Sequence, residues 1–290
     1  MLRKIVVILQ ILGVIALIAA AIFTLVLISN ISVARADEYY LDTSGYVEMD
    51  EELIEELQRA LNDKLDFIKS HSSDYYVNIK KLKPLKVDGK FGPQTLTRLK
   101  LFQYAAGLKV DGICGPATWK KLGKNYTDCI YYAPDLFEAF SASSSGYGFI
   151  LALDTNRHYV FETKEDGWLL IAKWKAATGN QKKGYITPSG TFLLSNKKGK
   201  NHDYIWKKDV WKADDATGFY HEEALGYFYL HATLDHWKNG EWVADDPDDV
   251  LGKSVSHGCV RLAPENAKWV SKHRNGTVLV IVDRDPLNLE

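Results

Sequence analysis

Residues 256–262 read Ser256-His257-Gly258-Cys259-Val260-Arg261-Leu262. The missing side chain of Gly258 allows another molecule to approach the backbone closely. A cysteine acts as a nucleophile when a base or local N–H groups favour its thiolate. Cys259 is therefore a candidate nucleophile, and its base must come from another part of the chain.

His231 is the candidate base because of its place in a predicted strand. Alternation along residues 227–231 puts the side chains of Tyr227, Tyr229 and His231 on one face of that strand. Phe228 and Leu230 take the other face. His231 thus shares its face with two hydroxyl-bearing rings, which indicates a semi-polar cleft and not a core.

The sequence around these residues has a hydrophobic period of two, which predicts strands. Residues 149–153 and 158–161 form a predicted hairpin around Asp154-Thr155-Asn156. Further strands are predicted over residues 168–175, 191–194, 227–231 and 277–282, with one short helix over 264–273. Residues 147–284 are therefore expected to form a mainly-β domain.

This domain resembles the L,D-transpeptidase catalytic domain of the YkuD type over about residues 147–284. The matching segments are Ala177-Thr178-Gly179, residues 187–192, Leu230-His231-Ala232-Thr233 and residues 256–262. The resemblance implies a β-sandwich with one short helix. It also implies that a cysteine forms a thioester with a peptidoglycan stem peptide, which a second peptidoglycan amine resolves into a cross-link. No metal and no cofactor are implied.

The resemblance further implies roles for single residues. Cys259 would be the nucleophile, His231 the general base, and His257 a group that orients and polarises the site. The N–H groups of Gly258 and Cys259 would stabilise the oxyanion, and Arg261 would organise the site or bind a stem carboxylate. The remaining substrate-binding residues implied are Ser256, Tyr229, Ala232 and Thr233.

Two insertions depart from the family pattern, and so does Ala232, which stands where the family usually has glycine. The spacing of 25 positions from His231 to Ser256 is longer than the usual spacing in the family. Within it, residues 235–242 are predicted to form a hairpin with an Asn-Gly turn. This hairpin would be a lid or a subsite wall. Residues 197–220 form a second excursion. Its aromatic residues either cap the donor peptide or pack on the sheet: Tyr204, Trp206 and Trp211.

An internal repeat marks a second domain. Val87-Asp88-Gly89-Lys90-Phe91-Gly92-Pro93-Gln94-Thr95-Leu96 returns 23 residues later, from Val110 to Trp119, with six of ten positions identical. In each copy Asp-Gly predicts a turn and Gly-Pro the start of a helix. With the helical period from Leu53 to Leu65 this predicts a compact three-helix module. It resembles a peptidoglycan-binding domain over about residues 51–123, with an unusually long loop between Phe67 and Lys86; the plainer alternative is a helical spacer.

The N-terminal segment predicts export. A basic start precedes residues 5–28, an apolar run long enough to span a bilayer as a helix. Ala34-Arg35-Ala36 fits a signal cleavage site, so residues 1–36 are a cleaved signal peptide or a membrane anchor. Residues 37–50 and 124–146 are predicted linkers, the second a flexible joint. The protein is thus expected to be extracytoplasmic, either anchored in the membrane or secreted to the cell wall.

Composition limits the remaining alternatives. The net charge of −1 excludes an electrostatic case for nucleic acid, and three cysteines are too few for a disulfide scaffold. Cys114 and Cys129 either pair or stay free. The expected partner is peptidoglycan, through its glycan strands and stem peptides. An L,D-carboxypeptidase and a catalytically inactive wall-binding protein stay open. His202 and Asp209 have the spacing of two zinc ligands in zinc peptidases. A zinc peptidase is nevertheless disfavoured, because the H-x-H motif that would supply a further ligand is absent from the sequence.

Overall fold

The computed structural model describes residues 51–127, 132, 134–165, 167–194, 202–206 and 209–287, with the backbone alone at 137, 202–206, 209 and 210. The predicted signal or anchor, the first linker and Cys129 lie outside these residues. No helix within the described ranges is long and apolar enough to cross a membrane.

The N-terminal domain is helical, with four α-helices where the sequence predicted three. Lys64 interrupts the first predicted helix because its backbone leaves the helical region (φ −97°, ψ 10°). Both Gly-Pro helix starts are confirmed. The elements are α2 (Glu51–Asp63), α3 (Leu65–His71), the short 3₁₀ helix η2 (Ile79–Lys81), α4 (Pro93–Ala105) and α5 (Pro116–Leu122).

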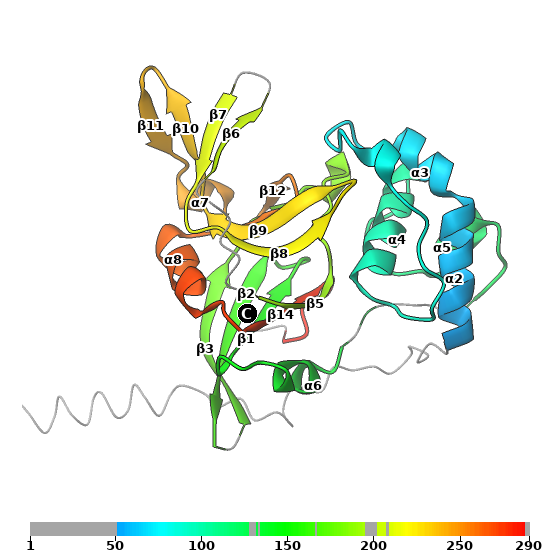
Figure 1. The fold of residues 1–290 in the computed structure, drawn as a ribbon, viewed down its shortest axis with the longest axis horizontal. Coiled ribbons are helices and arrows are strands. Elements are labelled where there is room, and N and C mark those ends of the chain that lie inside the picture. The colour runs from blue at the N-terminus through cyan, green and yellow to red at the C-terminus, as the bar shows by residue number, and fades with distance from the viewer. Residues whose placement is uncertain are drawn as a thin grey trace, which may run out of the picture.

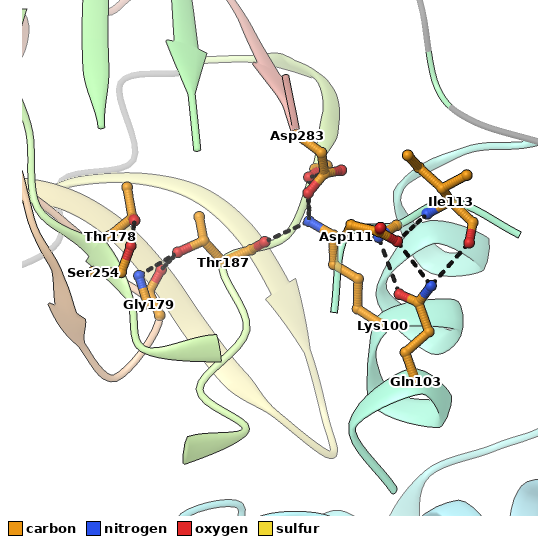
Figure 2. Close-up of polar contacts among 12 residues, drawn as sticks. Lys100, Gln103, Asp111, Ile113, Thr178, Gly179, Thr187, Ser254 and Asp283 are labelled. Atoms are coloured by element: carbon orange, nitrogen blue, oxygen red, sulfur yellow. Dashed lines mark hydrogen bonds and ion pairs between the residues drawn. The ribbon is translucent and has the colours of Figure 1, made fainter. Parts of the chain in front are cut away.

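Each Asp-Gly turn of the repeat is held by a buried glutamine. The Gln58 side-chain oxygen accepts hydrogen bonds from the N–H groups of Asp88 (2.8 Å) and Gly89 (3.1 Å). Gln103 repeats this contact with the N–H of Gly112 at 3.0 Å, and donates to Asp111 at 3.1 Å (Figure 2). The glutamine at each copy therefore satisfies buried backbone N–H groups of the turn. This gives a structural reason for the repeated Asp-Gly pair.

The C-terminal domain contains a five-stranded sheet in the order β3-β2-β1-β14-β5. Its strands β1 and β2 form the predicted hairpin, whose turn includes Asn156 at φ 51°. β1 and β14 run parallel, and the other neighbours are antiparallel. The strand bounds are Tyr147–Ala152 for β1, Arg157–Lys164 for β2, Gly167–Lys175 for β3, Gly190–Leu193 for β5 and Val278–Val282 for β14.

A three-stranded sheet in the order β13-β9-β8 carries the candidate site. It and the larger sheet bury one apolar cluster that includes Phe192, Phe228, Val260 and Leu279. The predicted helix over residues 264–273 is confirmed as α8, but the domain contains a second short helix, α7, that the sequence analysis did not predict. The elements are β8 (Thr217–Glu222), β9 (Gly226–Ala232), β13 (Val260–Leu262), the pair β4 (Thr178–Gly179) and β12 (Ser254–Ser256), η3 (Gln181–Lys183), α6 (Leu136–Ser141), α7 (Pro247–Val250) and α8 (Pro264–His273).

The two insertions pair with each other in a separate four-stranded sheet. Its order is β11-β10-β7-β6, from Glu241–Ala244, Asp235–Lys238, Asp209–Ala213 and His202–Trp206. The predicted turn is confirmed, because Asn239 (φ 51°) and Gly240 (φ 90°) both adopt positive φ. Figure 1 shows this sheet projecting from the rest of the β domain.

The helical and β domains share one continuous core, which also includes Leu57, Phe102 and Ile186. The helical domain lies beside the β domain, next to β5 (Figure 1). The predicted flexible joint is wrong for its serine-rich end, because Ser143 Oγ donates to the Tyr147 carbonyl (2.6 Å) and the Ser144 N–H donates to Gly276 (2.8 Å). The serine side chains and backbone bind the adjoining loop and fix the chain.

Buried His158 makes the stability of the fold sensitive to acid. Burial lowers its pKa to about 3, and neither ring nitrogen has a hydrogen-bond partner in the described part of the chain. The unfolded chain, with a histidine pKa of about 6.5, therefore binds more protons between these values. The free energy of unfolding should fall by a few kcal/mol as the pH drops from 6.5 towards 3, at about 1.4 kcal/mol per pKa unit.

His158→Phe should weaken this pH dependence, because phenylalanine keeps a ring against Trp174 and does not titrate. Urea unfolding at pH 7 and pH 4.5 measures the effect, with exposed His221→Phe as the control. An unchanged difference between the two pH values would contradict the assignment.

Candidate functional site

Strand register brings the two principal candidate residues together. β13 runs parallel to β9, with Arg261 opposite His231 and Val260 opposite Leu230. Cys259 directly precedes β13 and therefore shares a sheet face with Arg261 and His231, because alternate residues of a strand point the same way. The predicted alternation agrees with burial from Tyr227 to Leu230, because Phe228 and Leu230 are buried and Tyr227 is exposed. The alternation ends at His231, which is buried, with 6% of its surface exposed, where the sequence predicted a semi-polar cleft.

His231 is held in one orientation. Its Nδ1 lies 2.6 Å from the carbonyl oxygen of Ala232. A carbonyl only accepts hydrogen bonds, so Nδ1 carries the proton and Nε2 keeps a free lone pair. Burial lowers the pKa of His231 to about 4, with Arg261 lowering it further and the Ala232 carbonyl opposing the shift. The ring is therefore neutral at neutral pH and can accept a proton at Nε2.

Cys259 is intermediate in exposure as a residue. Burial raises the pKa of the thiol, while the backbone of Tyr229 and the positive charge of Arg261 oppose the rise. The resting pair is thus a thiol and a neutral imidazole.

Alkylation of Cys259 by iodoacetamide should follow this raised pKa. The rate should be lower at pH 7 than for a free cysteine, and should rise through a midpoint above about 8.5, the ordinary thiol value. Peptide mass spectrometry of the full chain isolates the Cys259 signal, and the urea-unfolded chain is the control. A plateau reached below pH 8 would contradict the prediction.

The loop before Cys259 is fixed by Ser256. Its hydroxyl donates to the carbonyl of Cys259 (2.5 Å) and accepts from the N–H of Gly258 (3.0 Å). Ser256 therefore already engages the Gly258 N–H that was expected to stabilise an oxyanion. The Cys259 N–H has no acceptor among the described residues.

Gly258 is required for steric reasons. Its φ is +126°, and a Cβ there would lie 2.7 Å from the carbonyl oxygen of Ile186 and 2.7 Å from the ring of Phe228. Thr187 Oγ1 donates to the Gly258 carbonyl at 2.9 Å and accepts from the Gly179 N–H, as Figure 2 shows for the second contact. The Ile186–Thr187 segment thus lies directly against the catalytic loop.

Two residues implied to bind substrate are buried. Ala232 donates its N–H to the Asp214 carbonyl (3.0 Å), and Thr233 donates its N–H to the Leu262 carbonyl (2.9 Å). Their backbones hold the end of β9, so a direct contact with substrate is not expected from either. Tyr229 is partly exposed, and its pKa is raised by burial and by nearby Cys259.

Arg261 is anchored by a residue that the sequence analysis missed. Its Nη1 lies 3.6 Å from the Asp245 carboxylate, which also lies 2.8 Å from His236 Nε2. Asp245 and His236 both belong to the insertion after His231. The insertion therefore holds the Arg261 guanidinium through Asp245. No local pattern marks Asp245, because its contact depends on the fold of β10 and β11.

His257 lies among aromatic rings. The ring of Tyr75 stacks on it at 4.6 Å and 13°, and Tyr185 lies 4.6 Å away at 51°. Trp211, one of the predicted capping residues, lies 5.9 Å from His257 at 18°; the side chains of Tyr204 and Trp206 lie outside the described residues. Burial lowers the pKa of His257, and Arg261 lowers it further.

The site combines a cysteine with a neutral histidine on one sheet face. Within the ranges described above, no three His, Cys, Asp or Glu side chains form a potential metal site. The side chains of His202 and Asp209 lie outside the described residues. The arrangement provides a sulfur nucleophile, a neutral base on the same face and one N–H donor at Cys259.

Two family models match the chain. Residues 148–282 match the L,D-transpeptidase catalytic domain, and residues 50–122 match a putative peptidoglycan binding domain. Among curated proteins, an uncharacterized protein from the bpoA1 3′ region of Kitasatospora aureofaciens is 44% identical over 61 residues, 21% of this chain and 51% of that protein. The zinc D-Ala-D-Ala carboxypeptidase of Streptomyces albus G is 53% identical over 38 residues, 13% of this chain and 15% of that protein. The chain thus spans about half of the first relative and less of the second.

Two solved structures show weak similarity to the chain. A fused Zn-dependent amidase/peptidase/peptidoglycan-binding protein from Clostridium acetobutylicum is 24% identical, with 79% of this chain and 95% of that one covered and a TM-score of 0.34. An L,D-transpeptidase fragment from Xylanimonas cellulosilytica is 22% identical, with 79% and 92% covered and a TM-score of 0.31. The chain joins a helical domain of the putative peptidoglycan-binding family to a mainly-β catalytic domain of the L,D-transpeptidase family.

Proposed function

We propose that this protein is a peptidoglycan L,D-transpeptidase that forms cross-links between stem peptides through a thioester at Cys259. The observation that carries the proposal is the shared sheet face of Cys259 and His231, with Nδ1 of His231 bound to the Ala232 carbonyl. This arrangement leaves Nε2 to accept the proton of the thiol.

In the first half-reaction, Cys259 Sγ attacks the carbonyl carbon of the scissile stem amide while Nε2 of His231 takes the thiol proton. The oxyanion accepts a hydrogen bond from the Cys259 N–H. The amide C–N bond breaks, and protonated His231 gives its proton to the departing amine of the terminal D-amino acid. The products are a thioester and a neutral His231.

In the second half-reaction, an amine of another stem attacks the thioester carbon and gives a proton to His231. The C–S bond breaks, an amide forms, and the sulfur regains its proton from His231. Water in place of the amine would give an L,D-carboxypeptidase. The helical domain is proposed to bind peptidoglycan, which raises the local concentration of stem peptides at the site. Because this substrate lies outside the cytoplasm, the enzyme is proposed to act there.

The test is incubation of the purified full chain with disaccharide-tetrapeptides, followed by mass spectrometry. A cross-linked dimer with free D-alanine supports the transpeptidase, whereas disaccharide-tripeptide alone identifies the carboxypeptidase. Cys259→Ser is the control, and equal product from that variant would reject the thioester. No product from the wild type would leave the inactive wall-binding protein as the better account, and loss of turnover in EDTA would favour a metal enzyme.

A further inference from the structure

A side chain from the helical domain reaches the candidate site. Tyr75 lies in the loop after α3, where the sequence departs from the peptidoglycan-binding pattern. Its ring stacks on His257 at 4.6 Å and 13°, and meets the ring of Tyr185 at 5.3 Å. The two stacked residues are far apart in sequence and come from different domains.

Tyr75 also lies within electrostatic reach of the reacting groups. Its pKa is raised to about 12, by burial first and then by Cys259 and Tyr185, with Arg261 opposing the rise. The phenol is therefore neutral at physiological pH. A neutral aromatic ring in this position packs against a neutral imidazole without placing a charge beside the thiol.

The neighbouring residue fixes the loop to the β domain. Tyr76 is buried, and its hydroxyl oxygen accepts a hydrogen bond from the N–H of Ile186 at 2.8 Å. The carbonyl of Ile186 occupies the space that a Cβ at Gly258 would need. The loop therefore contacts the catalytic segment at two points, directly through Tyr75 and indirectly through Ile186.

The interface around this loop is closely packed. The ring of Tyr104 on α4 lies 2.7 Å from where a Cβ at Gly184 would be, and Pro93 lies 2.6 Å from the same point at Gly190. Lys100 of α4 is fully buried and lies 2.6 Å from Asp283 and 3.4 Å from the Thr187 carbonyl (Figure 2). These contacts hold Tyr75 in a defined place.

From this geometry we infer that Tyr75 is a positioning residue of the candidate site, whose ring holds the imidazole of His257, two residues before Cys259, in one orientation. The inference rests on the proposed function and extends it: besides binding the wall, the helical domain contributes a side chain to the catalytic site. A soluble stem fragment, which needs no wall binding, should therefore still depend on Tyr75.

The test compares Tyr75→Ala, Tyr75→Phe and the control Val77→Ala in the full chain, with disaccharide-tetrapeptide as substrate. Val77 lies in the same loop and is 76% exposed. Tyr75→Ala should lower kcat about tenfold to a hundredfold, with a smaller change in KM, because a misplaced site slows the chemistry. Tyr75→Phe should restore kcat, since it keeps the ring. Thermal midpoints close to that of the wild type show that the variants are folded.

A spectroscopic readout separates this inference from the proposed function. The His257 imidazole proton resonances, assigned with His257→Gln, should shift in Tyr75→Ala and stay in place in Tyr75→Phe and Val77→Ala. Equal kcat for wild type and Tyr75→Ala would overturn the inference. A higher kcat for Tyr75→Ala would also overturn it, because it would mean that the ring obstructs access to the site. Loss of kcat in Tyr75→Phe would show that the hydroxyl matters and not the stacked ring. A wild type without product would overturn the proposed function instead, and the resonances would still report the contact.

Discussion

His231→Ala is expected to slow the acylation of Cys259 by about 10²–10⁴-fold, the usual contribution of a positioned general base. The variant removes the only group on the shared sheet face that we assign to take the thiol proton, and the raised pKa of Cys259 makes unassisted ionisation unfavourable. Single-turnover mass spectrometry of the acyl-enzyme, formed from disaccharide-tetrapeptide, measures the rate.

The matched control is His221→Ala on neighbouring β8. His221 is exposed and stacks on Tyr227 at 3.9 Å, on the same sheet but outside the pair formed by β13 and β9. Its acylation rate should match the wild type. An acylation rate unchanged in His231→Ala would reject the base assignment, and rescue of that variant by added imidazole would strengthen it.

Lys100→Met is expected to reduce the free energy of unfolding by about 3–5 kcal/mol, the cost of leaving one partner of a buried ion pair. Lys100 is 0% exposed and lies 2.6 Å from Asp283, which is 12% exposed; Ser189 Oγ also accepts from Lys100 at 2.5 Å. Removing the ammonium leaves a buried carboxylate without its counter-charge. Urea unfolding followed by tryptophan fluorescence measures the loss.

Lys109→Met is the control for this experiment. Lys109 pairs with Asp111 at 3.6 Å on the surface and is 83% exposed, so its loss should cost less than about 1 kcal/mol. The double variant Lys100→Met/Asp283→Asn should recover part of the loss, because it removes both charges. Equal effects of Lys100→Met and Lys109→Met would show that the interface is not held by this pair.

Most of the β domain could be predicted from local sequence. Short runs of apolar and β-branched residues located β1, β2, β9 and β14, and Pro264 marked the start of α8. These elements bury side chains in a pattern that a window of a few residues displays. The association of Cys259 with His231 came from the family resemblance, because no strand was predicted at residues 260–262, where β13 lies beside β9.

The rest of the site depends on tertiary contacts that no window displays. Tyr75 reaches His257 only because α4 docks on β5, and Asp245 meets Arg261 only because the insertion folds back. Lys100 sits in an otherwise ordinary helix pattern, and its burial follows from the interface. The engagement of the Gly258 N–H by Ser256 is local, but it depends on a backbone geometry that the residue types alone do not specify.

The docking of the helical domain on the β domain has a consequence for the architecture of the wall. A catalytic domain on a flexible linker could react with any stem peptide within the length of that linker. When the two domains share one core, the distance between Cys259 and the glycan bound by the helical domain is fixed. Under the proposed function, this enzyme therefore selects stem peptides at a set distance along the glycan strand. Cross-links that it makes should recur at a regular interval of disaccharides.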